Sequence, residues 1–374
     1  DGFNENMKAQ KNRSKSIKNE EVSDWIVIDD KSSSSMFLGY DMSEIDGRII
    51  KYRESKTDQD NISYHIVTDK TSFYPEGGGQ IGDIGQIISG DSEIQIKNTF
   101  KDTGEIIHET TELPDDIQSP VKLKIDENRR SLIESNHTST HLLHQALRNI
   151  LGKHVEQRGS MISDKMFRFD FSHQNKISDL ELVNITNFVN EKINQSIDII
   201  ENREEDYQIA IKNGAIGLFT EKYEDKVRTI KFNDSYELCG GTHVKNTGDI
   251  SSFKIISEGS QAFGIRRIVA TTNEEIIVAE NLKQKALKEK ADMENANKLL
   301  KKEQELQNKI KIQSIKDDLI KNITNQNDIN NFIGELDLDP KSIKELCFML
   351  SDKFENLFLI LISKSEEKVF ISCF

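Results

Sequence analysis

The sequence predicts an α+β protein in which strand-rich and helical parts follow one another along the chain. Three observations support this fold class. Residues 37–125 contain short strand patterns separated by turns, and residues 126–272 combine helical patterns with strands that we expect to be mainly antiparallel. Residues 273–321 contain no Gly or Pro and carry aliphatic side chains at a 3–4 spacing. We therefore expect a small β-barrel, an α+β core, a helical coiled-coil hairpin and a partial C-terminal domain.

Length and composition limit the broad class of protein. A chain of 374 residues is long enough for two or three domains, and 30% charged against 35% hydrophobic residues predicts a soluble protein. No run of eighteen apolar residues and no signal peptide is found, which predicts a cytoplasmic location and no membrane partner. Three cysteines are too few for a disulfide framework, and we expect Cys347 and Cys373, which lie in apolar runs, to be buried.

The net charge of −14 argues against a nucleic-acid partner, but only weakly, because acids concentrate in the helical tail. Six arginines lie near the candidate site in sequence and could form a local basic surface. They are Arg129, Arg130, Arg158, Arg168, Arg266 and Arg267.

The first part, residues 1–32, carries basic side chains at near-helical spacing and is expected to be the end of a helical linker or a solvated linker. The second part, residues 33–130, is the expected barrel. Its strand patterns cover Tyr64–Val67, Glu93–Lys97 and Val121–Ile125. The glycine-rich run Ser72–Asp83 lacks the Gly-Lys-Ser/Thr of a phosphate-binding loop, so we expect a tight turn whose backbone approaches another segment closely.

The third part, residues 131–272, contains the candidate site. Asp126 is a plausible N-cap for a helix that extends to about His154. At about 100° per residue one stripe is polar and the opposite stripe is aliphatic, so we expect the helix to bury its aliphatic face and to present a polar face of imidazoles and hydroxyls. The polar stripe contains Ile133, His137, Thr140, His141, His144 and Arg148. The aliphatic stripe contains Leu143, Ala146, Leu147 and Ile150.

His137 and His141 are four residues apart, so their imidazoles lie one turn above each other on this helix. Such a pair alone is more often structural than metal-binding. Cys239-Gly240-Gly241-Thr242-His243 repeats the spacing with one thiolate, and its two glycines permit a tight turn. Three imidazole nitrogens and one thiolate form a tetrahedral zinc site, so we predict Zn²⁺ at these four residues. No glutamate follows His137, which argues against a zincin protease.

The remaining core elements are predicted from caps and periodicity. Ser178 and Glu181 form a capping box for a helix that reaches about Gln195, and a further helix ends near Gly214. Strands are expected at 166–171, 227–232, 253–257 and 265–271.

The fourth part, residues 273–325, shows an imperfect heptad seam that could self-associate or fold back as an antiparallel hairpin. The fifth part, residues 326–374, is expected to be an incomplete C-terminal domain, because the chain reads as a piece of a longer protein.

Several motifs in one order resemble the alanyl-tRNA synthetase family downstream of its aminoacylation domain. They are Ser72–Asp83, Asn136–His144, Gln157–Ser160, Arg168–Phe171, Glu237–Val244 and Gly264–Arg267. The likeness covers about residues 37–272 and continues more loosely through the helical segment.

The resemblance implies an editing domain that hydrolyses the ester of tRNA(Ala) mischarged with serine or glycine. It implies that His137, His141, Cys239 and His243 hold zinc and that Thr140, Gln157 and Ser160 line the pocket. The implied partners are the acceptor end of tRNA(Ala) and the aminoacylation domain of the same full-length protein; neither that ATP-dependent domain nor the family's glycine-rich C-terminal tRNA-binding motif is found in this chain. Zinc could activate water, anchor the substrate or stabilise the fold.

An alanine-specific enzyme needs a second, hydrolytic site for a physical reason. A pocket for alanine cannot exclude glycine by size, and it rejects serine, with its added hydroxyl, by only about 10²-fold. Three other readings remain open. They are a free-standing trans-editing deacylase, a threonyl-tRNA synthetase editing domain and a non-catalytic tRNA-binding or dimerisation module.

Overall fold

The computed structural model describes residues 21–29, 35–56, 62–217, 223–364 and 369–374. These residues belong to two compact units, residues 1–280 and 281–374. Most of the expected helical linker, residues 1–20 and 30–32, lies outside the described residues, and the short strands Glu21–Val22 (β1) and Ile26–Val27 (β2) occupy the part between. The division into five parts stays a prediction. None of the described helices is long and apolar enough to cross a membrane.

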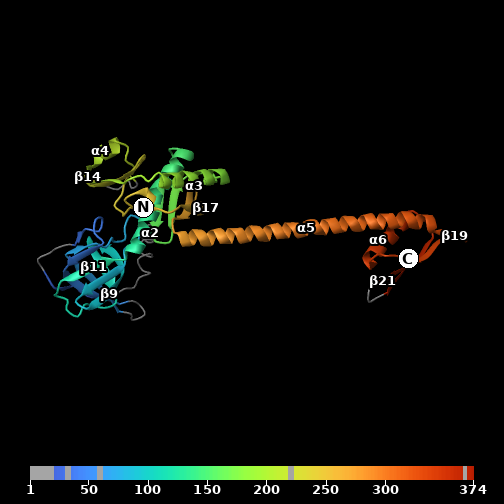
Figure 1. Cartoon of the computed structure of the whole chain (residues 1–374), viewed down its shortest axis with the longest axis horizontal. Helices are drawn as coiled ribbons and strands as arrows, with labels where there is room; N and C mark the ends of the chain where they lie inside the picture. Colours follow the sequence, from blue (N-terminus) through green and yellow to red (C-terminus); the bar gives the residue numbers. More distant parts are fainter. Residues whose placement is uncertain (1–20, 30–34, 57–61, 218–222, 365–368) are drawn as a thin grey trace, which may run out of the picture. The chain divides into compact units, whose positions relative to one another are not determined.

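A nine-stranded antiparallel sheet forms the first part of unit one, in the order β1-β5-β6-β10-β9-β8-β11-β4, with β2 also pairing with β5. Figure 1 shows it around β9 and β11. The strands are β4 (Glu44–Gly47), β5 (Ile49–Lys56), β6 (Ile62–Thr68), β8 (Gly85–Ser89), β9 (Ser92–Asp102), β10 (Glu105–Thr110) and β11 (Val121–Ile125). A small parallel pair, β3 (Met36–Phe37) with β7 (Lys70–Thr71), lies outside this sheet.

The expected closed barrel is wrong, because no ladder between described residues joins β4 to β1 or β5. The chain itself explains the difference. β4 ends at Gly47 and β5 begins at Ile49, so only Arg48 separates a terminal strand of the sheet from a strand near its other end. The covalent link at Arg48 therefore keeps β4 and β5 close together, so the sheet curls although no hydrogen-bonded ladder closes it. Its interior is apolar and includes Ile66, Phe73, Ile87 and Leu123.

The second part of unit one packs two helices against a four-stranded sheet of order β12-β13-β18-β17. Its elements are α2 (Glu127–Ile150), β12 (Gln157–Ile162), β13 (Phe167–Ser172), α3 (Asp179–Asn194), β17 (Lys254–Ala262) and β18 (Ile265–Thr271). A three-stranded sheet joins them, with a short helix and a 3₁₀ turn. These are β14 (Ile200–Asp206), α4 (Tyr207–Lys212), β15 (Lys226–Phe232), β16 (Ser235–Leu238) and η1 (Thr247–Asp249).

The local sequence signals for these helices are confirmed. The Asp126 side chain accepts from Arg129 N and caps α2, and the Ser178–Glu181 capping box begins α3. The polar stripe of α2 is buried together with the aliphatic stripe, because every residue from 135 to 147 is buried. Segments distant in sequence cover the polar stripe, and periodicity within one helix cannot reveal them.

The helix α5 (Glu274–Asn322) is one uninterrupted helix, so the expected hairpin is wrong. Its sequence contains no Gly or Pro that would end it, which explains the continuity. Its buried residues are Ile312 and Leu319 near the C-terminal end, whereas seam residues such as Leu282 and Leu300 are exposed.

Unit two forms a four-stranded sheet of order β19-β20-β21-β22, in which β20 and β21 are parallel. Its elements are β19 (Thr324–Gln326), β20 (Ile329–Glu335), α6 (Pro340–Ser351), β21 (Leu357–Lys364) and β22 (Val369–Cys373). The crossover helix α6 begins at Pro340 behind the N-cap Asp339, and it packs with Ile312 and Leu319 in an apolar core. Cys347 is buried there as predicted, whereas Cys373 is exposed, contrary to prediction.

Candidate metal centre

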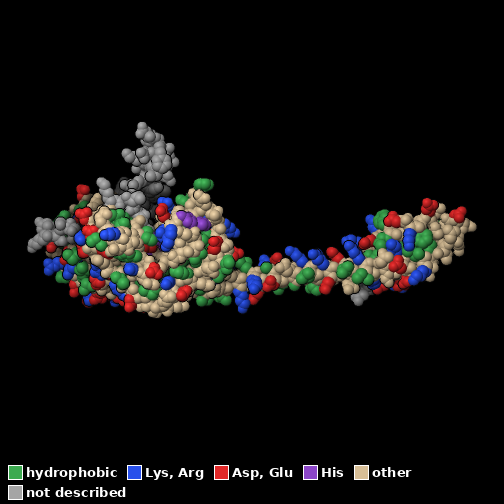
Figure 2. All heavy atoms as spheres, turned by 90° about the horizontal axis from the view of Figure 1, so that it is seen from above, with side chains coloured by type: hydrophobic (Ala, Val, Ile, Leu, Met, Phe, Trp, Pro, Cys, Tyr) green, Lys and Arg blue, Asp and Glu red, His purple; other side chains and the backbone are tan. Residues whose placement is uncertain are grey.

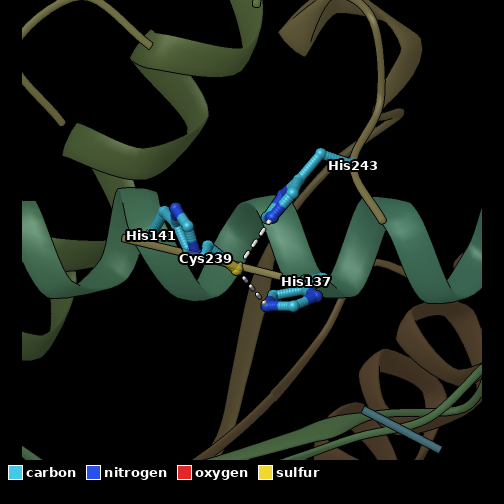
Figure 3. A group of neighbouring side chains, drawn as sticks. All are labelled: His137, His141, Cys239 and His243. Atoms are coloured by element: carbon cyan, nitrogen blue, oxygen red, sulfur yellow. Dashed lines mark hydrogen bonds between the residues drawn. The ribbon is translucent and has the colours of Figure 1, made fainter. Parts of the chain in front are cut away.

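Four side chains from two separate segments converge on one point in unit one. His137 and His141 come from α2, and Cys239 and His243 come from the loop after β16. One potential ligand atom from each lies within 4.8 Å of the other three. Figure 3 shows the four side chains pointing toward one another. The structure therefore brings together all four residues that the sequence predicted as a ligand set.

The spacing of these atoms fits a tetrahedral ion. Cys239 Sγ lies 3.5 Å from His137 Nε2 and 3.3 Å from His243 Nε2. With Zn–N of about 2.0–2.1 Å and Zn–S of about 2.3 Å, a tetrahedral site places sulfur and nitrogen ligands about 3.6 Å apart. One thiolate and three imidazoles are also a donor set that zinc prefers. The residues present thus fit a zinc ion by chemistry and by distance.

The electrostatics at Cys239 and His243 favour the protonation states that a metal requires. Burial alone would raise the pKa of the Cys239 thiol, but the nearby imidazoles, His137 above all, hold that pKa well below its ordinary value. Burial, followed by the influence of His137, lowers the pKa of His243 well below its usual range. Thiolate and neutral imidazole are the forms that bind metal.

His141 differs from the other ligands because it lies against a carboxylate. Burial would lower its pKa, but Glu237 and Cys239 outweigh burial and raise the pKa to about 9. Glu237 Oε2 lies 3.8 Å from His141 Nε2, and Glu237 Oε1 lies 2.9 Å from His144 Nδ1. Burial would raise the pKa of Glu237, yet His141 and His144 lower it. Glu237 is thus a buried anion behind the centre, and His144 is its hydrogen-bonded partner rather than a ligand.

The Cys-Gly-Gly loop is held from several sides. Arg228 Nη1 donates to the carbonyls of Cys239 at 2.8 Å and Gly241 at 2.7 Å. The Tyr40 hydroxyl donates to Gly240 O at 2.6 Å, and the Arg228 guanidinium lies over the Tyr40 ring at 4.0 Å. Gly241 N lies 3.4 Å from Cys239 Sγ and supports the thiolate. These contacts fix the loop before any ion binds.

Two further side chains orient ligand rings, and the sequence analysis missed both. Thr138 Oγ1 lies 3.1 Å from His243 Nδ1 and accepts from Val244 N at 3.3 Å. Gln80 Oε1 lies 2.8 Å from His137 Nδ1. The position of Thr138 within the helical motif could have suggested its role, but Gln80 lies 57 residues before His137, and no local spacing connects them.

A cavity of about 340 Å³ opens beside the metal centre and includes His137 and Cys239 in its lining. The predicted pocket residues Thr140, Gln157 and Ser160 all line the same cavity. Its other lining residues include Phe37, Tyr40, Tyr74, Glu76 and Lys101, together with the glycines at 77, 78, 240 and 241. The structure therefore joins the three predicted pocket residues to the ligand set in one site.

The pocket side chains carry directional hydrogen bonds. The Thr140 hydroxyl donates its one hydrogen bond to His137 O at 2.7 Å. The lone pairs of Thr140 Oγ1 can then accept a hydrogen bond from another molecule. Gln157 Nε2 donates to Ser160 Oγ at 3.1 Å, which leaves Gln157 Oε1 available to accept from a bound molecule.

Each of the six arginines that could form a local basic surface lies within ion-pair distance of a carboxylate, and Arg168 and Arg267 share Asp170. The pairs are Arg129–Asp164, Arg130–Asp83, Arg158–Glu156, Arg168–Asp170, Arg266–Glu258 and Arg267–Asp170. Figure 2 likewise shows acidic and basic side chains interspersed on the face in view.

Two parts of the chain match known protein families. Residues 1–129 match the family profile described as "tRNA synthetases class II (A)". Residues 227–269, which include Cys239 and His243, match that of the "Threonyl and Alanyl tRNA synthetase second additional domain". The chain is thus related to class II aminoacyl-tRNA synthetases.

More particularly, the chain is homologous to alanyl-tRNA synthetases, which confirms the resemblance seen in the motifs. It is 41% identical to the alanine–tRNA ligase of Christiangramia forsetii over 388 aligned residues, with 100% of this chain and 44% of the relative covered. The corresponding enzyme of Flavobacterium psychrophilum is 40% identical with the same coverage. That of Cytophaga hutchinsonii is 48% identical over 273 residues, or 72% of this chain and 31% of the relative. The chain spans under half the length of these relatives.

Proposed function

We propose that this chain carries the editing site of an alanyl-tRNA synthetase, which hydrolyses the ester of tRNA(Ala) mischarged with serine or glycine. One observation carries the proposal: a zinc-type ligand set borders, through His137 and Cys239, a small cavity that also contains Thr140, Gln157 and Ser160. The acceptor end of tRNA(Ala) is the proposed partner. The aminoacylation domain of the same full-length protein would supply the mischarged molecule.

Thr140 provides a means of recognising serine. Because its own proton is donated to His137 O, Thr140 Oγ1 can accept the hydroxyl proton of a seryl group. Alanine has no hydroxyl to donate, so the acceptor lone pairs of the buried Thr140 Oγ1 would receive no hydrogen bond from bound alanine. A site built around a substrate hydroxyl rejects an analogue that lacks it by roughly 10⁴-fold or more. Glycine also lacks the hydroxyl, so its acceptance depends on the cavity rather than on Thr140.

Hydrolysis requires one water to attack the ester carbonyl carbon, after which the bond to the ribose oxygen breaks. Gln157 Oε1 is available to accept a hydrogen bond from that water and so to orient it, while the bond from Gln157 Nε2 to Ser160 Oγ fixes the amide orientation. One proton of the water ends on the ribose oxygen that leaves. His137, His141, Cys239 and His243 would hold a zinc ion, which supplies Lewis-acid chemistry when bound. Because four protein ligands would fill a tetrahedral site, contact of the ion with either a water or the substrate would require one ligand to be displaced.

The proposal is tested by incubating the full chain with Ser-tRNA(Ala), Gly-tRNA(Ala), Ala-tRNA(Ala) and Ser-tRNA(Thr) and following loss of the ester. We expect rapid loss of the first two and retention of the last two. Metal content measured on the same sample shows whether zinc is bound. Bound zinc without loss of any ester would identify a non-catalytic module, whereas rapid loss of Ser-tRNA(Thr) would contradict the substrate assignment.

A further inference from the structure

Gln80 connects the glycine-rich run to the metal centre through a fully buried amide. Its side chain is 0% exposed. Gln80 Oε1 lies 2.8 Å from His137 Nδ1 and accepts from Thr242 N at 3.0 Å. Gln80 Nε2 donates to Thr242 Oγ1 at 3.0 Å. One amide thus contacts a ligand on α2 and the loop that carries the other pair of ligands.

The glycine-rich run has the backbone geometry needed to place Gln80 there. Gly77 and Gln80 exchange two backbone hydrogen bonds of 3.0 Å, which close a tight turn. Gly79 has a φ of +88°, and a Cβ at this position would lie 2.5 Å from Ser160 Oγ. The turn also pairs with β12, because Ile162 N donates to Gly79 O at 2.7 Å. The predicted close backbone approach is therefore confirmed, and its result is an inward-facing glutamine.

The hydrogen bond to the Gln80 amide oxygen determines which imidazole nitrogen of His137 carries the proton and which keeps its lone pair. Gln80 Oε1 can only accept a hydrogen bond, so His137 must carry its proton on Nδ1. His137 Nε2, which lies 3.5 Å from Cys239 Sγ, is then left with its lone pair facing the ligand cluster. Groups that fix the tautomer and ring orientation of a metal-bound histidine typically contribute 10–100-fold to metal affinity.

We infer that Gln80 is a positioning residue for the metal centre, one that holds His137 in its metal-binding tautomer and couples the glycine-rich run to the Cys-Gly-Gly-Thr-His loop. This inference rests on the proposed zinc site. The packing around this contact is close: a Cβ at Gly241 would lie 2.0 Å from His137 Cε1 and 2.8 Å from Gln80 Oε1. Loop, imidazole and amide therefore fit together only when a glycine lies between them.

The test compares two substitutions of Gln80 in the full chain. Gln80→Leu removes the acceptor at similar size, whereas Gln80→Glu keeps oxygen acceptors for His137 Nδ1 and for Thr242 N. Zinc affinity is measured by competition with a chelator, and the absorption of the cobalt-loaded protein reports the ligand geometry. Gln86→Leu is the matched control, because Gln86 lies in β8 and its amide donates to the exposed Glu93 at 3.3 Å.

We expect Gln80→Leu to weaken zinc binding by about 10–100-fold and to change the cobalt spectrum. Gln80→Glu should restore affinity to within a few fold of wild type, and Gln86→Leu should leave it unchanged. Equal zinc affinity in Gln80→Leu and wild type would overturn the inference, as would equal losses in Gln80→Leu and Gln80→Glu.

A second variant keeps the inference testable if Gln80→Leu does not fold, as judged by far-UV circular dichroism. Thr242→Val removes the hydroxyl that accepts from Gln80 Nε2 but keeps the backbone donor. We expect a smaller loss of zinc affinity, about 3–10-fold, by the same loss of orientation. Unchanged affinity and an unchanged cobalt spectrum would contradict the inference. A wild-type chain that binds no zinc would overturn the inference and the proposed metal centre together, whereas zinc binding without ester hydrolysis would overturn the proposed function alone.

Discussion

The two compact units differ in what they bury. The interior of residues 1–280 contains imidazoles, carboxylates and a guanidinium, including His108, Arg130, His141 and Glu237. Among the described residues of 281–374, the buried set is aliphatic apart from Cys347 and the hydroxyls of Ser342 and Ser363. Burying polar groups costs free energy unless they are hydrogen-bonded. The stability of the first unit therefore depends on hydrogen bonds to its buried polar side chains, whereas that of the second depends mainly on apolar packing.

The difference shows that burial of a polar side chain does not by itself mark a functional site. Arg130 is fully engaged: it pairs with Asp83 and donates to Gly39 O at 2.8 Å and Ser72 O at 3.1 Å. His108 likewise contacts Thr71 Oγ1 at 2.8 Å and Ile66 O at 3.1 Å. The ligand cluster differs because its members face one another and two of them, His137 and Cys239, border a cavity. Access to a cavity distinguishes the candidate site from the structural networks.

The largest expected effect concerns the ligand cluster. Cys239→Ala removes the only thiolate, so we expect loss of zinc and a fall of deacylation to the uncatalysed rate. Metal analysis and the Ser-tRNA(Ala) assay measure both. Cys373→Ala, at an exposed cysteine of the second unit, is the control and should change neither. Full activity with undiminished zinc in Cys239→Ala would reject the ligand assignment.

The next largest effect is expected on the free energy of unfolding, where loss of a buried ion pair should cost more than loss of an exposed one. Arg130→Met leaves Asp83 buried without its partner and should lower the free energy of unfolding of the first unit by about 3–5 kcal/mol. Lys311→Met breaks an exposed pair with Asp337 in the second unit and should change stability by less than about 1 kcal/mol. Urea unfolding is followed by Trp25 fluorescence, which reports the first unit, and by circular dichroism at 222 nm, to which the helices of both units contribute. Equal effects would contradict the distinction between the two interiors.

Gln157→Ala separates the pocket from the metal. We expect deacylation to fall by about 10²-fold, because the group that positions the water is lost, while zinc content stays at the wild-type level. Gln195→Ala, at the exposed C-cap of α3, serves as the control. Loss of zinc in Gln157→Ala would assign this residue to the scaffold rather than to the pocket.

A pH effect tests the buried His108. Burial lowers the pKa of His108 from 6.5 to about 4, so the unfolded chain takes up a proton at a higher pH than the folded one. The stability contributed by neutral His108 is complete above pH 6.5 and is lost as the pH falls toward 4, by about 2 kcal/mol between pH 7 and pH 5. Between pH 7 and pH 5 the free energy of unfolding of His108→Gln should therefore fall by about 2 kcal/mol less than that of the wild type. Urea unfolding at both pH values measures the difference. Identical pH dependence in the two proteins would contradict the assignment.

The smallest expected effect lies on α5. Leu300 is 56% exposed, so Leu300→Ala should change the free energy of unfolding by no more than about 0.5 kcal/mol in a monomer. Thermal unfolding at several protein concentrations, combined with sedimentation, measures the effect. A loss above about 1 kcal/mol that grows with concentration would show that a second copy covers the seam, as the heptad pattern predicts.

Local signals in the sequence were sufficient for much of the fold. The caps Asp126 and Ser178 marked the starts of α2 and α3, and alternation located β11 and β13. The same signals failed where the outcome depended on distant partners. They predicted a closed barrel where β4 continues into β5, and they did not show that both faces of α2 are buried.

The sequence by itself determined the chemistry of the site, because residue type and four-residue spacing decide which atoms a helix or a tight turn can present. Tertiary structure alone decided which groups surround those atoms. Gln80 against His137, Glu237 against His141 and Arg228 on the Cys-Gly-Gly loop each join segments separated by many residues. Such contacts depend on how whole sheets and helices pack, and packing leaves no periodic trace in the sequence.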